Sequence, residues 1–442
     1  MLSKKIFLVF IFAVCNAAHA TLPIQHWTLE NGARVYFVEN RELPMLDISV
    51  EFDAGDRRDP EGKSGMASLT NAMLARGISE GRLPDGQVEP AMTEAQISDA
   101  FADIAARRGG GAGEDRAGAT LRTLSSKQER DAAVALLGRL LAQPSFPEDL
   151  LVRDKARTIA AIKEDLTKPE SIASKAFWRI AYGSHPYADE ATVESVEAIS
   201  REDLVAFHST HYVANRAVIA MIGNVSRAEA DAIARQLSRR LPQGKDLPAL
   251  PEVVLANGRE EWIAHPASQS HILVGTPALV RGDPDFFALT VGNYVLGGGG
   301  FVSRLTREVR EKRGLAYSVY SYFNPLQQRG PFQIGLQTQK EQTAEALAIV
   351  RKVVADYLAE GPSDKDLQAA KDNLIGGFPL RIDNNRKILD NIAAIGYYNL
   401  PLNYLDTWTA NVAKVTVSDV KAAFKRKLAL ERFNTVVVGA QQ

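Results

Sequence analysis

Two periodicities in the hydrophobic positions divide the first half of the chain into strands and helices. Apolar residues alternate between Leu46 and Phe52, which is typical of a half-buried strand, and Asn31-Gly32 between two apolar runs predicts a hairpin turn. Apolar residues three and four positions apart predict helices. The predicted strands cover residues 26–38, 46–52, 117–124 and 217–222, and the predicted helices cover 65–76, 93–107, 127–142, 147–166, 171–180 and 201–210. The helix over residues 93–107 is expected to be stopped by the glycines at 109–111.

The second half of the chain repeats part of this plan. SREDL at residues 200–204 parallels TVSDV at 416–420, and NRAVIAMIG at 215–223 parallels ERFNTVVVG at 431–439, both at an offset of 216 residues. A shared offset across a helix-to-strand unit indicates a duplication, and upstream the offset is expected to drift through insertions. Strands precede helices in each half, so the predicted fold class is α+β, with two homologous domains, each an antiparallel-rich sheet packed with helices.

A proline-rich stretch separates the two halves. Pro242, Pro248 and Pro251, together with Gly244, disfavour regular structure. Residues 242–254 are therefore the expected linker, with an N-terminal domain at residues 21–241 and a C-terminal domain at residues 255–442.

Residues 1–20 have the features of a signal peptide. Lys4 and Lys5 precede an apolar run, and Ala18-His19-Ala20 matches a small-x-small cleavage site. The apolar run is too short to span a bilayer, so we expect no membrane insertion, cleavage after Ala20, and a periplasmic protein. Lipidation of Cys15 is the alternative, and it is disfavoured because Val14 is larger than the small residue that normally precedes a lipidated cysteine.

Composition and charge narrow the choice of partner and of metal site. The chain has 442 residues, 45% hydrophobic and 24% charged, as is ordinary for a soluble globular protein, and its net charge of −1 gives no basis for a nucleic-acid partner. The single cysteine, Cys15, lies in the expected signal peptide. The mature chain therefore forms no disulfide and no thiolate metal site.

One segment of the second half, GGGGFVSRLTREVREKRGLAYSVYSY, combines a glycine run with a helix and a strand. Val302, Leu305 and Val309 share one face of a predicted helix over residues 302–312. Gly314 is expected to be its left-handed C-cap residue. A strand is predicted over residues 315–322 because aromatic and β-branched residues are frequent there.

This arrangement places Arg310 near the end of the helix and Tyr317 near the start of the strand. A tight cap can bring the two side chains together, where a fixed cation and a phenol donor suit a carbonyl oxygen that becomes negative. The alternative reading of the same spacing is an ordinary glycine loop, a solvated arginine and a half-buried tyrosine ring.

Residues 297–317 resemble the motif in the C-terminal half of the pitrilysin/insulinase family of zinc peptidases, which includes the mitochondrial processing peptidases. The resemblance implies that Arg310 and Tyr317 contact the substrate and help to stabilise the tetrahedral intermediate. It also implies two homologous α+β domains that pair with another such chain to enclose a chamber. The residues expected to let the substrate backbone approach closely are Gly297, Gly298, Gly299, Gly300 and Phe301.

The zinc motif of that family is missing from the chain. Catalytic members carry H-x-x-E-H on the first helix, where two histidines bind zinc and the glutamate activates water. Here that helix reads GMASLTNAML, with Ser68, Asn71 and Ala72 at the ligand and base positions, and the distal glutamate falls near Ala160 or Ala161. These residues supply neither imidazole nor carboxylate. We therefore expect no metal in this chain.

Other polar residues do not replace the missing motif. His208 and His211 could share a helix face, but their place at a helix-to-strand junction favours a structural role. Glu164 lies one turn beyond the expected distal position. Ser68 has no evident base, so it is not expected to act as a nucleophile.

The resemblance and the missing motif together imply a non-catalytic subunit of a heterodimeric zinc metallopeptidase. It would lend Arg310 and Tyr317 to the zinc site of a partner chain that carries H-x-x-E-H, and the substrate would be an oligopeptide. Zinc is expected in that partner, no cofactor is expected in this chain, and the chain alone is expected to be inactive. The alternatives are a structural or peptide-binding subunit with no part in turnover, and a stand-alone hydrolase with a different site.

Overall fold

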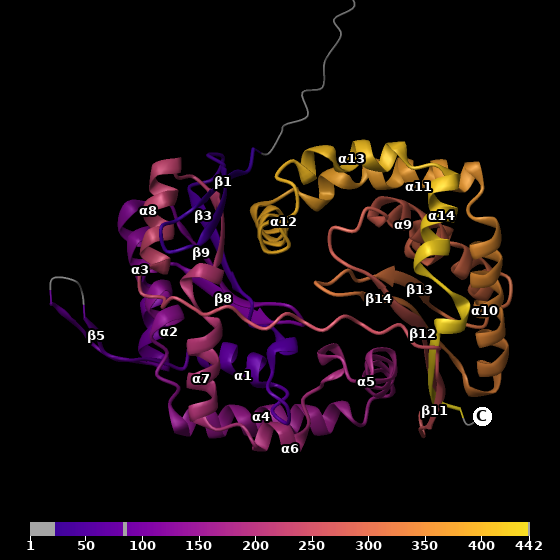
Figure 1. The fold of residues 1–442 in the computed structure, drawn as a ribbon, viewed down its shortest axis with the longest axis horizontal. Helices are drawn as coiled ribbons and strands as arrows, with labels where there is room; N and C mark the ends of the chain where they lie inside the picture. Colours follow the sequence, from indigo (N-terminus) through magenta and orange to yellow (C-terminus); the bar gives the residue numbers. More distant parts are fainter. Residues whose placement is uncertain (1–22, 83–85, 441–442) are drawn as a thin grey trace, which may run out of the picture.

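The computed structural model describes residues 23–82 and 86–440, which form two halves of similar plan (Figure 1). The first half is built on a six-stranded sheet in which only β2 and β10 run parallel. In spatial order its strands are β1 (Gln25–Thr28), β2 (Arg34–Glu39), β10 (Val218–Gly223), β3 (Met45–Phe52), β9 (Ala117–Leu124) and β8 (Arg107–Ala112).

The second half is built on a five-stranded sheet in which only β11 and β15 run parallel. Its strands in spatial order are β11 (Glu260–Ala264), β15 (Asn434–Gly439), β12 (Gln269–Leu279), β14 (Gly330–Gln339) and β13 (Val319–Phe323). Two small ribbons pair β4 (Gly77–Ile78) with β7 (Met92–Thr93) and β5 (Gly81–Arg82) with β6 (Val88–Glu89). The predicted α+β class with antiparallel-rich sheets is confirmed.

Helices cover both sheets. Those of the first half are α1 (Met66–Met73), α2 (Glu94–Asp103), α3 (Lys127–Ala142), α4 (Glu148–Asp165), α5 (Pro169–Tyr182), α6 (Val193–Glu197), α7 (Arg201–His211) and α8 (Arg227–Ser238). Those of the second half are α9 (Phe286–Asn293), α10 (Thr343–Glu360), α11 (Asp364–Gly376), α12 (Asn385–Tyr397), α13 (Tyr404–Lys414) and α14 (Val417–Lys427). No helix in the described ranges is long and apolar enough to cross a membrane.

The internal repeat is confirmed by the element boundaries. Helices α7 and α14 begin 216 residues apart, and so do strands β10 and β15. Helices α5 and α12 also begin 216 residues apart, so the offset holds further upstream than the expected drift allowed. The repeated unit therefore runs back to a helix for which the sequence comparison gave no signal.

Each half lends one helix to the sheet of the other. Helix α5 packs on β12 and β15, where Phe177 lies among Leu273 and Val436. Helix α12 packs on β2 and β10, where Ile392 lies among Tyr36 and other apolar side chains. Figure 1 shows these two helices between the halves, on opposite sides of the extended segment that joins them. The exchange buries apolar surface of both halves against each other.

A buried carboxylate ties the two halves together. Asp115, in the turn between β8 and β9, accepts hydrogen bonds from Arg57 and Tyr187 of the first half. It also accepts hydrogen bonds from the Gln327 N–H (2.7 Å) and the Tyr398 hydroxyl (2.8 Å) of the second half. A charge this deeply buried is tolerated because each oxygen is satisfied by donors.

Three of the predicted elements differ from the structure. Residues 109–111 were expected to stop a helix that ran to residue 107, but α2 ends at Asp103 and the glycines lie within β8. The predicted helix 302–312 is a 3₁₀ turn (Gly300–Val302) followed by a π-helical segment (Thr306–Glu311), and Val302 is exposed. The strand predicted over residues 315–322 is shorter in the structure, where β13 runs from Val319 to Phe323.

The segment between the halves, residues 242–259, is neither helix nor strand. It is held against the first half, since Arg58 donates a hydrogen bond to the Pro248 carbonyl at 2.8 Å and His185 lies 3.1 Å from the Pro251 carbonyl. The domain limits, with the linker at 242–254, stay a prediction. The expected signal peptide, residues 1–20, lies outside the described residues.

Candidate functional site

Helix α1, which carries the altered zinc motif, is fixed at its N-terminus by a carboxylate. Asp59 accepts hydrogen bonds from the backbone N–H groups of Gly65 (2.6 Å) and Ala67 (2.8 Å). Gly65 has φ +97°, a conformation that favours glycine. A carboxylate at a helix N-terminus is electrostatically favourable, whereas burial raises the pKa of Asp59 to about 7.

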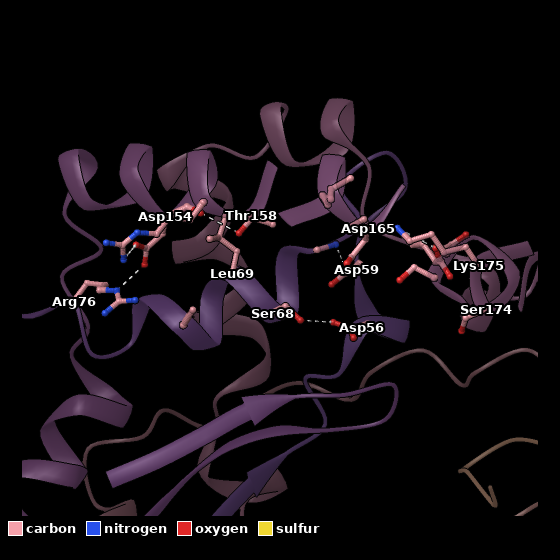
Figure 2. Close-up of a pocket in the computed structure, with 18 residues that line it drawn as sticks. Asp56, Asp59, Ser68, Leu69, Arg76, Asp154, Thr158, Asp165, Ser174 and Lys175 are labelled. Carbon is pink, nitrogen blue, oxygen red and sulfur yellow. Dashed lines mark hydrogen bonds and ion pairs between the residues drawn. The ribbon is translucent and has the colours of Figure 1, made fainter. Parts of the chain in front are cut away.

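A cavity of about 580 Å³ lies between α1 and α4 (Figure 2). Ser68 and Ala72, one helical turn apart on α1, both line it and are exposed to it. Thr158 and Ile162 line it from α4. The helix face that would carry zinc ligands in a catalytic relative therefore still opens onto a cavity.

The three substituted residues do not fit a zinc ion. The Ser68 hydroxyl donates a hydrogen bond to Asp56 at 3.1 Å, and Ala72 has no ligand atom. The Asn71 amide donates to the Gly118 carbonyl at 3.0 Å and to the Tyr212 hydroxyl at 3.1 Å, so it links α1 to the sheet. Residues 23–82 and 86–440 contain no group of three or more His, Cys, Asp or Glu side chains that could hold a metal ion.

Helix α4, where the sequence places the missing distal glutamate, turns one face to the cavity. Thr158 lines the cavity, as do Asp154, Arg157, Ile162 and Asp165, whereas Ala160 and Ala161 do not line it and are exposed. Glu164 is exposed and forms an ion pair with Lys168 at 2.8 Å. The placement of the distal position near Ala160 or Ala161 stays a prediction, and neither alanine lines the cavity.

Carboxylates surround the cavity, and their environments differ. Burial raises the pKa of Asp56 to about 6, although the Ser68 hydrogen bond opposes this shift. Asp154 is paired with Arg76 at 2.6 Å, as Figure 2 shows. Burial also raises the pKa of Glu190, which faces Lys175 at 3.6 Å. These carboxylates are engaged with neighbouring donors or buried, and none occupies the position of the missing glutamate base.

The cap between Arg310 and Tyr317 has the predicted geometry. Gly314 has φ +65°, and its N–H donates to the Arg310 carbonyl at 2.8 Å. The Leu315 N–H donates to the Val309 carbonyl at 3.0 Å. These two bonds close the end of the helical segment on a left-handed glycine, as a C-cap does.

The two side chains beyond this cap do not contact each other. The Arg310 guanidinium lies over the ring of Phe301, 4.7 Å from its centroid. Tyr317 is 86% exposed. Across the described part of the chain, no hydrogen bond, ion pair or ring contact joins Arg310 to Tyr317, and Arg310 has no acidic partner. The expected meeting of the two groups is therefore not seen, and both remain available to another molecule.

The glycines before this helix differ in their surroundings. Gly297 is buried, and an added Cβ would lie 2.3 Å from the Ser321 hydroxyl oxygen, so packing alone requires glycine there. Gly298 and Gly300 are exposed, and an added Cβ at Gly300 would meet nothing within 4 Å. Phe301 is 68% exposed. A substrate-binding role for residues 297–301 stays a prediction.

The histidines that were considered as metal ligands are buried. His208 lies 2.8 Å from the Leu141 carbonyl, and His211 lies 2.8 Å from the Asp53 carbonyl. Burial lowers the pKa of His208 to about 4, so its ring is neutral at physiological pH. Both rings bridge α7 to the surrounding fold.

The sequence interpretation missed one candidate functional element. Strand β8 is the edge of the first sheet, where β9 is its one partner among the described strands, and it packs beside α1. Gly109, Gly110 and Gly111 leave its backbone bare and exposed. The glycine triplet was the available signal, and it was interpreted as a helix stop.

Comparisons with known proteins agree with this geometry. The family model described as "Peptidase M16 inactive domain" matches residues 198–374. The crystal structure of a peptidase M16 inactive domain from Pseudomonas fluorescens is 39% identical, with a TM-score of 0.88, and the match covers 95% of this chain and 98% of that one. A Helicobacter pylori protein named "Non-peptidase homolog YmxG" is 26% identical over 432 residues, 96% of this chain and 95% of its own length.

A more distant likeness extends to the fold alone. The periplasmic protease PqqL from Escherichia coli has a TM-score of 0.79 at 16% identity, and the match covers 95% of this chain and 46% of that one.

Proposed function

Because the chain belongs to the peptidase M16 family, we propose that it is the non-catalytic subunit of a heterodimeric zinc metallopeptidase. One contrast carries the proposal. Ser68, Asn71 and Ala72 replace the metal ligands and base. Arg310 and Tyr317 keep the family motif, and within the described residues neither side chain has a hydrogen-bond or ion-pair partner, although Arg310 lies over the Phe301 ring. A partner chain with H-x-x-E-H would supply the metal and the base.

The role of this chain would be to bind an oligopeptide and to stabilise its reacting carbonyl. Arg310 offers a permanent cation and Tyr317 offers a hydroxyl donor, and both donors become stronger in a site from which water is excluded. The left-handed Gly314 cap separates them along the chain, with Arg310 in the π-helical segment and Tyr317 in the irregular segment before β13. They would act on the oxygen that gains negative charge when the peptide bond is attacked.

The open edge of β8 supports peptide binding. An extended peptide can add to an exposed edge strand through backbone hydrogen bonds. Because β8 packs beside α1, a peptide there would run along the helix that faces the cavity. Bare glycines let the peptide backbone approach without a steric conflict.

The proposed location and partners follow from the same reasoning. The Lys4 to Ala20 pattern supports export to the periplasm through a cleaved signal peptide. The partner is the zinc-bearing subunit, and the second ligand is the peptide substrate. No feature of the charge pattern supports a nucleic-acid partner.

The test is reconstitution of the mature chain with an M16 partner that carries H-x-x-E-H, with cleavage of a fluorogenic oligopeptide as the measurement. Tyr317→Phe is expected to lower kcat roughly 10²–10³-fold, the usual cost of one lost oxyanion donor. Arg310→Ala is expected to change both kcat and KM because it removes charge and stem. Tyr320→Phe is the matched control, since Tyr320 is a neighbouring exposed tyrosine on β13.

The second candidate function is a structural or peptide-binding subunit with no part in turnover. The observation in its favour is the lack of contact between Arg310 and Tyr317 within the described residues. If both variants assemble with the partner on size-exclusion chromatography and keep wild-type turnover, this second function replaces the first.

A further inference from the structure

A small cavity at the start of β8 is lined by arginines. It has a volume of about 210 Å³ and contains Arg107 and Arg108 of β8, Arg122 of β9 and Arg386 of α12. We call these four residues the arginine pocket. Because α12 comes from the second half of the chain, the pocket lies where the two halves meet. Asp47 is the acidic residue among the described residues that line it.

The positive charges of the arginine pocket are only partly neutralised. Asp47 is buried and pairs with Arg122 at 2.6 Å, and Arg386 forms an exposed pair with Asp390 at 3.2 Å. Within residues 23–82 and 86–440, neither the Arg107 side chain nor the Arg108 side chain forms an ion pair or a hydrogen bond, and their backbones pair with β9. Burial and Arg76 lower the pKa of Arg108, whereas Glu94 opposes the shift. Neighbouring residues of a strand point to opposite faces, so the Arg108 side chain is directed away from that of Arg107.

The strand register brings two of these cations into direct opposition. Arg122 lies opposite Asp47 on β3 and opposite Arg107 on β8, so the three share one face of the sheet. Like charges directly opposite each other destabilise a sheet. A bound anion would remove this cost, and guanidinium groups bind carboxylates through paired hydrogen bonds.

We propose that the arginine pocket binds a carboxylate of a peptide that adds to the open edge of β8. The carboxylate belongs either to an acidic side chain or to the C-terminus of the peptide. Residues 109–111 hold the backbone, and the pocket at Arg107 gives the site a preference for acidic ligands. If the peptide adds antiparallel, as β9 does on the other side, its carboxy-terminal residues lie opposite Arg107. The inference rests on the proposed peptide-binding function.

The test measures binding of fluorescent peptides to the mature chain without a partner. Three N-terminally labelled peptides share one uncharged extended sequence: one ends in an amide, one ends in a free carboxylate, and one ends in an amide but carries a glutamate near its C-terminus. At least one acidic peptide is expected to bind about tenfold more tightly than the neutral amide, the effect of one good charge-assisted hydrogen bond. The acidic peptide that binds more tightly identifies the source of the carboxylate.

Variants localise the effect. Arg107→Gln and Arg386→Gln are expected to remove the preference for the acidic peptide while leaving the affinity for the neutral amide unchanged. Arg351→Gln is the control, because it removes an exposed arginine from α10, away from the arginine pocket. Arg122 is left intact, since its substitution would remove the ion-pair partner of the buried Asp47.

Two results overturn the inference in distinguishable ways. Equal affinity for acidic and neutral peptides, or loss of the preference in Arg351→Gln as well, overturns the arginine pocket and leaves peptide binding standing. Absence of binding by all three peptides overturns the pocket and the peptide-binding role together. A failure of the reconstituted peptidase with peptide binding intact concerns only the catalytic role of Arg310 and Tyr317.

Discussion

Burial of the Asp56 carboxyl group, which lines the cavity, makes the stability of the fold depend on pH. Its pKa is raised from 3.8 to about 6, so the folded chain holds this proton more tightly than the unfolded chain does. Below pH 4 both states are protonated, and the group has no net effect. As pH rises from about 4 to about 6, the folded state must bury a charge that the unfolded state exposes, and stability from this group is lost.

Asp56→Asn is therefore expected to be more stable than wild type at pH 8 and equal to it below pH 4. The gain is about 1–3 kcal/mol, from about 1.4 kcal/mol per unit of pKa shift. The amide oxygen can still accept the Ser68 hydrogen bond. Urea denaturation at the two pH values measures the difference, and an equal gain at both would show that ionisation of Asp56 is not its cause.

The cavity geometry makes a second residue-scale prediction. The triple variant Ser68→His, Ala72→His, Thr158→Glu is expected to bind one zinc per chain, because the histidines share a helix face and Thr158 lines the same cavity. The wild type and the variant with Ala161→Glu in place of Thr158→Glu are expected to bind none. Metal analysis after dialysis, with circular dichroism as the folding control, decides. Equal binding by the Ala161 variant would contradict the observed orientation of α4.

At this scale the sequence was informative where chemistry depends on fixed spacing. The loss of zinc ligands at Ser68 and Ala72 was visible because paired histidines must lie one turn apart. The sequence does not show which face of α4 turns toward the cavity. That orientation depends on how α4, with Thr158, packs against α1, which is distant in the sequence. The partners of Asn71 were also hidden, since Gly118 and Tyr212 are distant in sequence.

Among the elements, strand β8 has one position, Gly110, where the backbone conformation and the close approach to β9 both require glycine. Gly110 has φ +148°, and an added Cβ would lie 2.3 Å from the Gly118 carbonyl oxygen of β9. Gly111 has ordinary φ, and an added Cβ would meet nothing within 4 Å. A side chain at position 110 would therefore clash with β9, whereas a side chain at position 111 has room.

Gly110→Ala is expected to lower the free energy of unfolding by about 1–3 kcal/mol, the usual cost of a strained backbone conformation. Gly111→Ala is the matched control and is expected to stay within about 1 kcal/mol of wild type. Urea denaturation measures both. If the two variants lose the same stability, close approach to β9 is not the reason for glycine at position 110.

The elements also show which patterns determine local structure. Helix α3 matches its predicted limits, residues 127–142, because apolar residues such as Ala133, Leu137 and Leu140 recur at the helical period, although every residue from 136 to 141 is buried. The glycine triplet of β8 has no such period, and only pairing with β9 makes it a strand. The segment after Gly300 has Leu305 and Val309 buried as predicted. Val302 is exposed, because it lies in a separate 3₁₀ turn that ends at the extended residue Ser303.

In the whole molecule, the two halves are joined by the exchanged helices and also by the polar contacts of Asp115, which accepts hydrogen bonds from both halves. Its side chain is 1% exposed and its ion-pair partner Arg57 is 2% exposed. Asp115→Ala would leave Arg57 with a weaker set of partners and would leave donors from both halves unsatisfied. The expected loss is about 3–5 kcal/mol, the range for breaking a buried ion pair.

Chemical denaturation of Asp115→Ala measures this loss. Asp356→Ala is the control, since Asp356 and Lys352 form an exposed pair on α10 whose loss is expected to cost less than about 1 kcal/mol. A similar small effect at Asp115 would mean that the apolar exchange of helices holds the halves together without this carboxylate.

The exchange of α5 and α12 has a consequence for the origin of the molecule. In an isologous two-fold dimer, both subunits contribute the same surface to the interface, so each contact occurs twice. This chain has the architecture of such a dimer fused end to end, with residues 242–259 as the tether that makes association intramolecular and independent of concentration. In a fused chain the two copies need not be identical, so α1 can carry Ser68 and Ala72 independently of the segment that carries Arg310 and Tyr317.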